Sequence, residues 1–337
     1  MSSYLTRRIY MKIALVFRSK KRNEFSIENL FSDIEKHFKI SYQKYFVPYG
    51  RYNRLRFLIG NINYVKKIRA DIVHITGEIY YVVPFIKSKN IIITLHDFVN
   101  LEQMNGIKKL ISWTFWNYIP FKKANYIVCI SPKVFNETVE RFPFTKNKLI
   151  YIPNPVGDEY QYTQKNFNKK NPNILAIGTR INKNLERIIE AVKDINCTLT
   201  IIGILTDYQA KLLESSGVVY ENYFRIPNSK VLELYKNSDI VCFPSLYEGF
   251  GRPIVEAQAI GRAVVTSNLE PMKQVAGDSS ACLVDPYDVL DIRKGIMKVI
   301  EDDKYREGII EKGLENVKQY RADIIAKKYE DVYKKMI

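Results

Sequence analysis

Short β-rich segments alternate with helical segments along almost the whole chain, and this alternation constrains the fold more than any other feature. Five strand candidates lie in the first half, at residues 13–17, 72–75, 91–95, 126–130 and 149–152. Five more lie in the second half, at residues 174–177, 198–202, 240–243, 263–266 and 282–284. Strands separated by helices pair in parallel, and helices cover both faces of the resulting sheet. The sequence therefore predicts an α/β protein built from doubly wound parallel sheets.

The length of the chain and a polar break divide this alternation into two domains. At 337 residues, 46% of them hydrophobic, the chain is longer than one ordinary core requires. Residues 161–173 are rich in Gln, Asn and Lys and separate the two series of strands. We predict an N-terminal domain at 11–160, a C-terminal domain at 171–320 and a last helix at 321–337 that crosses back to the first domain. Residues 1–10 precede the first strand and are interpreted as an appendage.

The formal net charge of +16 implies an anionic partner. A nucleic acid, a phosphate-bearing ligand and an acidic membrane surface all satisfy this requirement. No stretch reaches the roughly 18 to 20 apolar residues of a membrane-spanning helix. The four cysteines lie far apart, without the Cys-x-x-Cys spacing of a metal site, so we expect buried free thiols and no bound metal.

The most informative segment, residues 244–261, has the pattern of a strand end, a glycine loop and a helix. Pro253 suits the first helical turn, and Gly261 suits the position just past the helix end. Gly249 and Gly251 allow a ligand to approach the backbone closely. The N–H groups at a helix start attract anions, so a diphosphate fits this loop.

Two glutamates flank the glycine loop with the spacing Glu-x7-Glu. Glu248 lies in the loop and Glu256 lies on the first turns of the helix. Carboxylates accept hydrogen bonds from sugar hydroxyls, and a diphosphate between two polyols describes a nucleotide sugar. The alternative is a pair of solvated charges at a helix start, where acidic residues stabilise the helix dipole. The Gly-Phe-Gly and Pro residues between the glutamates favour the ligand-binding interpretation.

The same segment resembles the signature of glycosyltransferase family 4, whose GT-B fold has two Rossmann-like domains that face each other across a cleft. The resemblance covers most of residues 174–320 and is weaker in the first half. The matching segments are residues 71–77, 94–97, 151–155, 176–191, 235–256 and 267–286.

The resemblance implies roles for individual residues of the donor domain. In the family, the first paired glutamate contacts the donor sugar and the second binds the ribose, which correspond here to Glu248 and Glu256. Arg180 and Lys183 match the basic pair that holds the diphosphate, although they are only three residues apart and Thr179 stands where many members have Arg. Exposed loop cations without function remain the alternative for both basic residues. The expected donor-binding set is Thr179, Arg180, Lys183, Gly249, Phe250, Gly251, Ile254, Val255 and Glu256.

A histidine completes the expected site. His96 follows the strand candidate 91–95 and matches the family histidine that reaches the transferred sugar. His96 and Glu248 are therefore the catalytic candidates. His74, inside another strand candidate, is expected to be a hydrogen-bonded core residue.

The resemblance implies a retaining hexosyltransferase that uses a nucleotide diphosphate sugar, with UDP or GDP as the expected carrier and no further cofactor. The acceptor is expected to be a glycan or lipid-linked glycan in cell-surface polysaccharide assembly. No Asp-x-Asp motif is present, so we expect metal-independent transfer in which Lys183, Arg180 and a helix start meet the leaving diphosphate. Two alternatives stay open: another GT-B enzyme, such as an epimerase or a phosphorylase, and a basic nucleic-acid-binding protein.

Residues 106–124 contain both tryptophans of the chain among other aromatic residues, bracketed by Lys108, Lys109, Lys122 and Lys123. This segment is either an interfacial helix with an aromatic face toward anionic lipid or a core helix with packed aromatics. Six further basic residues favour the first interpretation: Lys20, Lys21, Arg22, Arg51, Arg54 and Arg56. We therefore expect a cytoplasmic enzyme with peripheral contact to the inner face of the cytoplasmic membrane.

Overall fold

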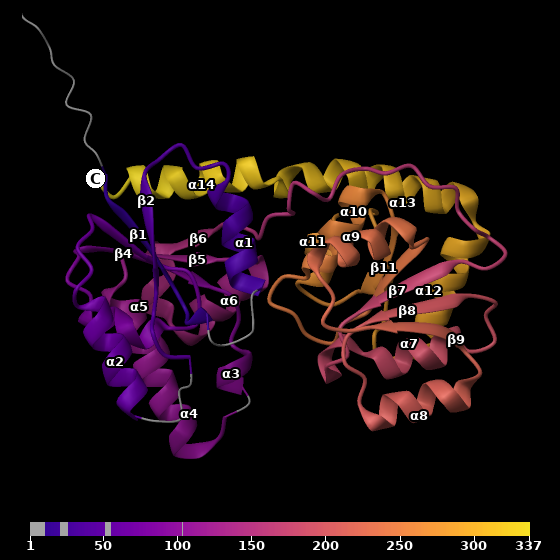
Figure 1. Cartoon of the computed structure of the whole chain (residues 1–337), viewed down its shortest axis with the longest axis horizontal. Coiled ribbons are helices and arrows are strands. Elements are labelled where there is room, and N and C mark those ends of the chain that lie inside the picture. The colour runs from indigo at the N-terminus through magenta and orange to yellow at the C-terminus, as the bar shows by residue number, and fades with distance from the viewer. Residues whose placement is uncertain (1–10, 21–25, 51–54, 103) are drawn as a thin grey trace, which may run out of the picture. The chain divides into compact units, whose positions relative to one another are not determined.

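The computed structural model describes residues 11–20, 26–50, 55–102 and 104–337, and the chain divides into two compact units (Figure 1). The first unit comprises Met1–Pro153 and Asp323–Ile337, and the second comprises Asn154–Ala322. Residues 1–10, interpreted above as an appendage, lie outside the described residues. No helix within the described ranges has the length together with the hydropathy that a bilayer crossing demands.

The first unit contains a six-stranded parallel sheet. Its strands are β1 (Ile13–Phe17), β2 (Tyr42–Phe46), β3 (Ile72–Ile75), β4 (Asn90–Leu95), β5 (Tyr126–Cys129) and β6 (Leu149–Tyr151). They follow the spatial order β2-β1-β3-β4-β5-β6. Ile13 of β1 pairs with Tyr42 of β2 on one side and with Ile72 of β3 on the other. The strand order therefore changes direction beside β1, which is where doubly wound sheets bind ligands.

The helical elements of the first unit cover both faces of this sheet. They are α1 (Ser26–Glu35), α2 (Leu55–Val65), η2 (Tyr80–Phe85), α3 (Val99–Glu102), α4 (Gly106–Ser112), the π-helix η3 (Trp113–Tyr118), α5 (Ile119–Lys123), α6 (Pro132–Arg141), η4 (Pro143–Lys148) and α14 (Ala322–Lys334).

The last helix returns to the first unit, as predicted. Ile325, Tyr329 and Tyr333 of α14 share a buried cluster with Phe17 of β1 and Phe31 of α1. This burial of one apolar helix face fixes α14 against the sheet of the first unit.

The second unit contains another six-stranded parallel sheet. Its strands are β7 (Asn173–Ile177), β8 (Thr198–Ile202), β9 (Val219–Tyr223), β10 (Ile240–Phe243), β11 (Ala263–Ser267) and β12 (Cys282–Val284). They follow the order β12-β11-β10-β7-β8-β9, so the order reverses between β7 and β10. This is the strand order of a dinucleotide-binding domain.

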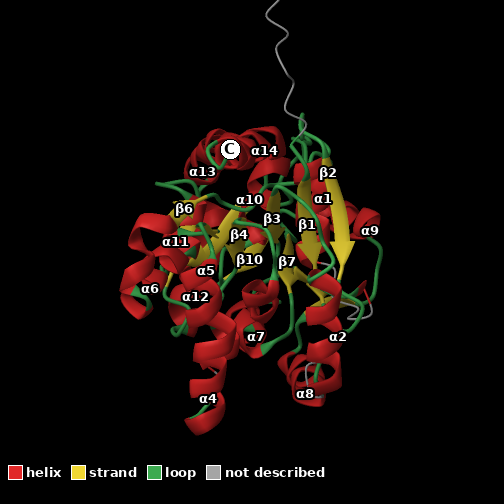
Figure 2. Cartoon of the chain, turned by 90° about the vertical axis from the view of Figure 1, so that its left-hand side faces the viewer, coloured by secondary structure: helices red, strands yellow, loops and turns green. Residues whose placement is uncertain are grey.

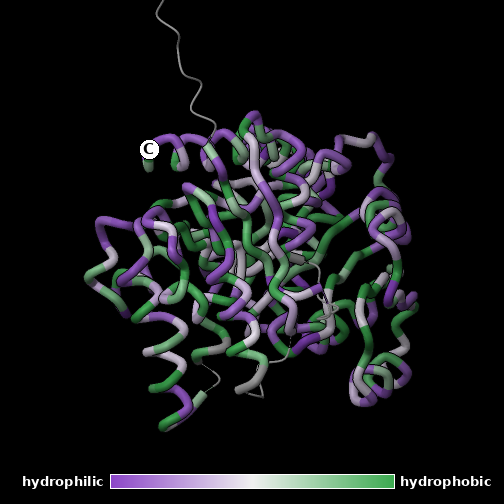
Figure 3. Tube along the Cα trace, turned by 60° about the vertical axis from the view of Figure 1, so that its left-hand side comes forward, coloured by the Kyte–Doolittle hydropathy of each residue, from purple (hydrophilic) through white to green (hydrophobic). Residues whose placement is uncertain are grey.

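The helical elements of the second unit lie between these strands in the chain or follow the last of them (Figure 2). They are η5 (Ile181–Lys183), α7 (Leu185–Val192), α8 (Asp207–Ser216), α9 (Asn228–Asn237), α10 (Arg252–Ile260), α11 (Met272–Ala276), α12 (Val289–Glu301), α13 (Asp303–Asn316) and η6 (Val317–Tyr320). Ile188 of α7 and Ile296 of α12 share one buried cluster with Ile174 and Ala176 of β7. In Figure 3, hydrophobic and hydrophilic segments alternate along the trace, as this layered packing requires.

All ten predicted strands are present, with ends that agree to within one residue, but β2 and β9 were not predicted. Both are edge strands whose residues are exposed or half-buried. Because no residue of either strand is buried, the sequence shows neither the apolar run nor the strict alternation by which a strand is recognised. The four cysteines are buried and free, as expected.

Candidate functional site

The loops after β7 and β10 lie side by side in the second unit. Ile174 of β7 pairs with Ile240 of β10 in parallel, so the carboxyl ends of both strands meet at one edge of the sheet. Predicted donor-binding residues follow both strand ends: Thr179, Arg180 and Lys183 after β7, and Glu248 after β10.

Lys183 crosses from the first of these loops to the second. Its Nζ lies 2.5 Å from Oε1 of Glu248 and 4.7 Å from the ring centroid of Phe243. Gly178, with φ at +90°, permits this path, because a Cβ there would come within 2.8 Å of Cγ of Lys183. The structure thus brings two predicted residues from distant segments into direct contact.

Two asparagines that sequence reasoning missed hold these loops together. Asn182 donates to the carbonyl of Tyr247 at 2.9 Å and accepts from the N–H of Leu246 at 2.8 Å. Asn184 is buried and donates to the carbonyls of Pro244 at 3.0 Å and of Pro286 at 2.7 Å. The available signal was the residue type, since Asn adopts the left-handed conformation, seen here with φ at +62°, more readily than most residues.

The start of α10 has the predicted geometry. Gly251 has φ at +105°, Pro253 lies in the first turn, and Gly261 ends the helix with φ at +80°. Phe250, Ile254 and Val255 have buried side chains, and the ring of Phe250 packs edge-on against Tyr320 at 5.6 Å. Since these side chains belong to the core, any contribution of Ile254 or Val255 to ligand binding falls to their backbone.

Glu256 is held on α10 by two neighbours. The hydroxyl of Tyr235 donates to its Oε2 at 2.6 Å, and Nε of Arg252 lies 3.3 Å from its Oε1. Burial and the adjacent carboxylate raise the pKa of Tyr235 well above its usual value, so the phenol remains a donor. Neither Tyr235 nor Arg252 was predicted as a site residue. Arg252 lies four residues before Glu256, a helical spacing that signals the contact.

Thr179 and Arg180 precede Lys183 in the loop after β7. The Thr179 hydroxyl donates to the carbonyl of Ile204 at 2.6 Å, and Arg180 is exposed to solvent. The cation of Arg180 is thus accessible to a ligand at this edge.

His96 lies in the first unit, directly after β4. It is 8% exposed, and its Nε2 donates to the carbonyl of Thr76 at 2.8 Å. A carbonyl only accepts, so neutral His96 carries its lone pair on Nδ1. Burial lowers the pKa of His96, which keeps the ring neutral near pH 7. Arg18, after β1, is paired with Glu28 at 3.0 Å.

His74 is the core residue that was expected. Its Nδ1 lies 2.7 Å from the hydroxyl of Tyr333, and its Nε2 lies 2.8 Å from Oγ1 of Thr94. Burial lowers the pKa of His74 to about 3.

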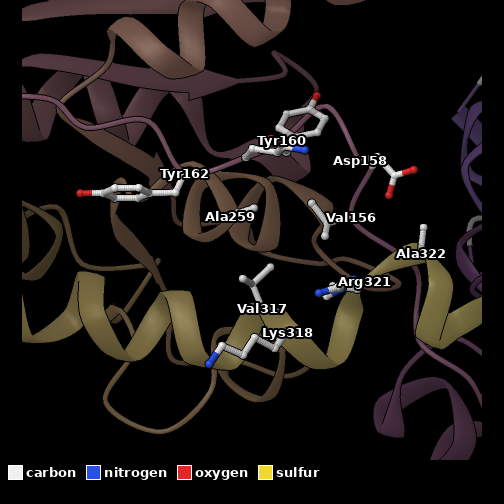
Figure 4. Close-up of a pocket in the computed structure, with 11 residues that line it drawn as sticks. Val156, Asp158, Tyr160, Tyr162, Ala259, Val317, Lys318, Arg321 and Ala322 are labelled. Carbon is white, nitrogen blue, oxygen red and sulfur yellow. The ribbon is translucent and has the colours of Figure 1, made fainter.

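A pocket of about 450 Å³ lies beside α10 (Figure 4). Tyr160, Ala259 and Arg321 are among its lining residues, and none of the predicted donor-binding residues is. The ring of Tyr160 packs edge-on against Tyr235 at 5.5 Å, so the pocket wall adjoins the residue that holds Glu256. Within the described ranges, no three His, Cys, Asp or Glu side chains are grouped so that they could hold a metal ion.

Two sequence-family models together match most of the chain. Glycosyltransferase Family 4 matches residues 15–160, and Glycosyl transferases group 1 matches residues 159–316.

Curated relatives include two mannosyltransferases of Escherichia coli. The chain is 35% identical over 210 residues to O-antigen chain mannosyltransferase B, a match that covers 56% of this chain and 53% of that protein. It is 26% identical over 214 residues to serotype-specific mannosyltransferase WbdA, covering 56% of this chain and 26% of that protein. The matches thus span about half the length of the first relative and about a quarter of the second.

Solved structures resemble the chain over nearly its full length. A glycosyltransferase from Rickettsia africae has a TM-score of 0.75 at 16% identity, covering 97% of this chain and 99% of that chain. Anabaena HepE, solved in complex with UDP and glucose, has a TM-score of 0.77 at 14% identity, covering 96% and 100%. At these identities the likeness concerns the fold.

Proposed function

The chain belongs to glycosyltransferase family 4 and has the two-domain GT-B fold, and from this premise we propose that it transfers a hexose-type sugar from a nucleotide diphosphate donor to a glycan acceptor. One observation carries the proposal. Lys183 and Glu248, from separate loops, meet at 2.5 Å where the strand order of the second unit reverses. A cation and a carboxylate at that edge suit the two ends of a sugar diphosphate.

The diphosphate contacts Lys183, Arg180 and the backbone of residues 249–251 in this proposal. The ion pair with Glu248 keeps the Lys183 ammonium at the sheet edge before a ligand arrives. A diphosphate carries more charge than one carboxylate and draws Lys183 toward itself. Glu248 then accepts hydrogen bonds from the donor sugar, and Thr179 lines the same loop.

The nucleotide lies along the start of α10, with Glu256 as the acceptor for the ribose hydroxyls and backbone contacts at Ile254 and Val255. Tyr235 holds one oxygen of Glu256 and leaves the carboxylate further lone pairs for the ribose. UDP and GDP are the carriers that we favour. HepE, which shares the fold, was solved with UDP.

The transfer proceeds with retention of the anomeric configuration. The bond from the anomeric carbon to the phosphate oxygen breaks, and the acceptor oxygen attacks the same face of the resulting oxocarbenium-like ion. The acceptor proton passes to the leaving phosphate, whose negative charge Lys183 and Arg180 stabilise. His96, neutral and with its lone pair on Nδ1, accepts a hydrogen bond from a hydroxyl of the transferred sugar.

The acceptor is a glycan or lipid-linked glycan of cell-surface polysaccharide assembly. The similarity to E. coli O-antigen mannosyltransferase B supports this acceptor class.

A ligand screen tests the proposed function. Calorimetry and saturation-transfer spectra with UDP, GDP and ADP sugars should show binding of one nucleotide class, and an acceptor should trigger release of the nucleotide diphosphate. Proton NMR of the product should show the anomeric configuration of the donor. Conversion of the sugar without an acceptor would indicate an epimerase, and binding of none of these donors would refute the transferase.

We further predict that turnover persists after chelation, because the positive charge at the leaving group comes from Lys183, Arg180 and the helix start. Rates measured with and without EDTA should agree within about twofold. A rate abolished by EDTA and restored by manganese would show a metal requirement.

A further inference from the structure

Helix α4 presents a row of large apolar side chains to solvent. Ile107 is 78% exposed, Leu110 63%, Ile111 47%, and Phe115, at the start of η3, 53%. None of the residues of α4 is buried. We call Ile107, Leu110, Ile111 and Phe115 the α4 apolar face, because spacings of three and four residues place side chains on one side of a helix.

The α4 apolar face lies at an extremity of the first unit. In Figures 1 and 2, α4 projects from this unit on the side away from α14. A projecting helix with an unburied apolar face gains little from packing within its own unit, so the face is suited to an external partner.

The other aromatic residues of segment 106–124 pack within the first unit. Trp113 stacks on Phe142 at 5.3 Å, Trp116 contacts Tyr81 at 5.1 Å, and Phe121 is fully buried. The tryptophans therefore do not form the interfacial face that the sequence suggested as one alternative. The aliphatic residues before them remain exposed.

The lysines of this segment form two pairs: Lys122 and Lys123 contact other parts of the first unit, whereas Lys108 and Lys109 lie on α4. Lys123 donates to the carbonyls of Pro84 and Ile86 at 2.9 and 2.6 Å, and Lys122 lies 5.0 Å from the ring centroid of Tyr118. Lys108 and Lys109 are exposed on α4 itself. Of the other basic residues invoked from sequence, Lys21, Arg22, Arg51 and Arg54 lie outside the described residues, as does the side chain of Arg56.

Charge decides between the possible occupants of the α4 apolar face. Residues 106–123 contain lysines and no acidic residue. A second copy docked through the same face would bring Lys108 and Lys109 against their own counterparts, which is unfavourable. An anionic lipid surface offers both an apolar phase for the face and opposite charge for the two lysines.

We propose that the α4 apolar face enters the headgroup region of an anionic bilayer, with Lys108 and Lys109 bound to lipid phosphates. This docking involves no residue of the donor site, so it holds or fails independently of the sugar transfer proposed above.

Vesicle flotation of the full chain tests the docking. The probe is a vesicle of phosphatidylglycerol and phosphatidylcholine in low salt, with pure phosphatidylcholine for comparison. Wild-type protein should float with the anionic vesicles. Ile107→Ser, Leu110→Ser, Ile111→Ser and Phe115→Ser combined should lower binding by at least about tenfold, and Lys108→Glu with Lys109→Glu should do the same.

A matched control replaces exposed aliphatic residues of the second unit. Val219 and Leu290 are 66% and 64% exposed, and Val219→Ser with Leu290→Ser should float as the wild type does. Circular dichroism reports the fold of each variant, and calorimetry with UDP and GDP reports the donor site separately. If the serine variant does not fold, the Lys→Glu variant decides.

The docking is overturned if the wild type stays in the soluble fraction with anionic vesicles. Binding that survives both sets of substitutions overturns it too. A wild-type dimer that the serine variant dissociates, without vesicle binding, would assign the α4 apolar face to a second copy instead.

Discussion

Each unit contains its own six-stranded parallel sheet, yet the two units place different chemistry at the carboxyl ends of their strands. In the second unit, Lys183 and Glu248 lie partly exposed at the reversal of strand order. In the first unit, Arg18 is already paired with Glu28, and the buried ring of His96 is neutral. The fold thus determines where a ligand can lie, and the loop residues determine its charge.

In the proposed function, this difference corresponds to the anionic part of the donor at the second unit and neutral sugar contacts at the first. All three histidines of the chain, His37, His74 and His96, belong to the first unit, as do both tryptophans. The units can therefore be perturbed and observed separately.

The largest expected effect is that of Lys183→Ala. In the proposed mechanism its ammonium stabilises charge that grows on the leaving diphosphate, so turnover should fall by roughly a hundredfold to a thousandfold. Initial rates at saturating donor and acceptor measure this. Lys193→Ala, which removes an exposed lysine just after α7, is the control and should leave the rate unchanged. A Lys183→Ala rate within about threefold of wild type would remove Lys183 from the mechanism.

A smaller loss is expected for Glu256→Gln. The amide keeps the shape of the side chain but loses the charge that strengthens the proposed hydrogen bonds to the ribose. Nucleotide affinity should fall by roughly tenfold to a hundredfold in calorimetry. The control is Glu190→Gln, an exposed glutamate of α7. Equal affinity of Glu256→Gln and wild type would exclude the ribose role.

Part of the candidate site and of the fold could be predicted from the sequence. Glu248, Glu256 and the glycine loop stand in one short segment, and strands β1, β3, β8, β10 and β12 were predicted with the bounds observed. Asn182, Asn184 and Tyr235 were missed because their partners lie between 21 and 102 residues away along the chain. Contacts at such separations depend on strand order, which hydrophobic patterns do not reveal.

The edge strands were missed, and the exposure of α4 was not foreseen residue by residue, for a related reason. Residue type predicts burial only on average: β9 exposes Val219 and α4 exposes Ile107 and Leu110, which are residue types that ordinarily pack inside. The exposed residues of β2, in contrast, are the polar Gln43 and Lys44. Within residues 106–124 the tryptophans were the expected exposed group, whereas the exposed large apolar residues are aliphatic apart from Phe115.

Acidification should affect the first unit through His74. Its pKa is about 3 in the folded chain and about 6.5 when unfolded, so the unfolded chain binds more protons between these values. Stability from His74 is therefore complete above pH 6.5 and is lost as the pH falls toward 3. The loss between pH 6.5 and 5 is about 2 kcal/mol. Urea unfolding followed by tryptophan fluorescence, which reports the first unit, should show it.

A fluorescence transition that is independent of pH between 6.5 and 5 would contradict the predicted effect of His74 on the stability of the first unit. His74→Gln supplies the control, because the amide can still bond Tyr333 and Thr94 but does not titrate in this range. His96, whose pKa is also lowered by burial, should leave a residual dependence of the same sign in that variant.

The smallest effect expected is that of Tyr235→Phe, which keeps the ring packed against Tyr160 and removes the hydrogen bond to Glu256. As a positioning residue, Tyr235 acts only through Glu256, and a bond of this kind contributes about 1 kcal/mol, or roughly fivefold in nucleotide affinity. A double-mutant cycle separates positioning from general destabilisation. In the Glu256→Gln background, Tyr235→Phe should weaken nucleotide binding by less than about twofold, whereas in the wild type it should show its full effect. Equal losses in both backgrounds would mean that Tyr235 supports the second unit as a whole and does not orient Glu256.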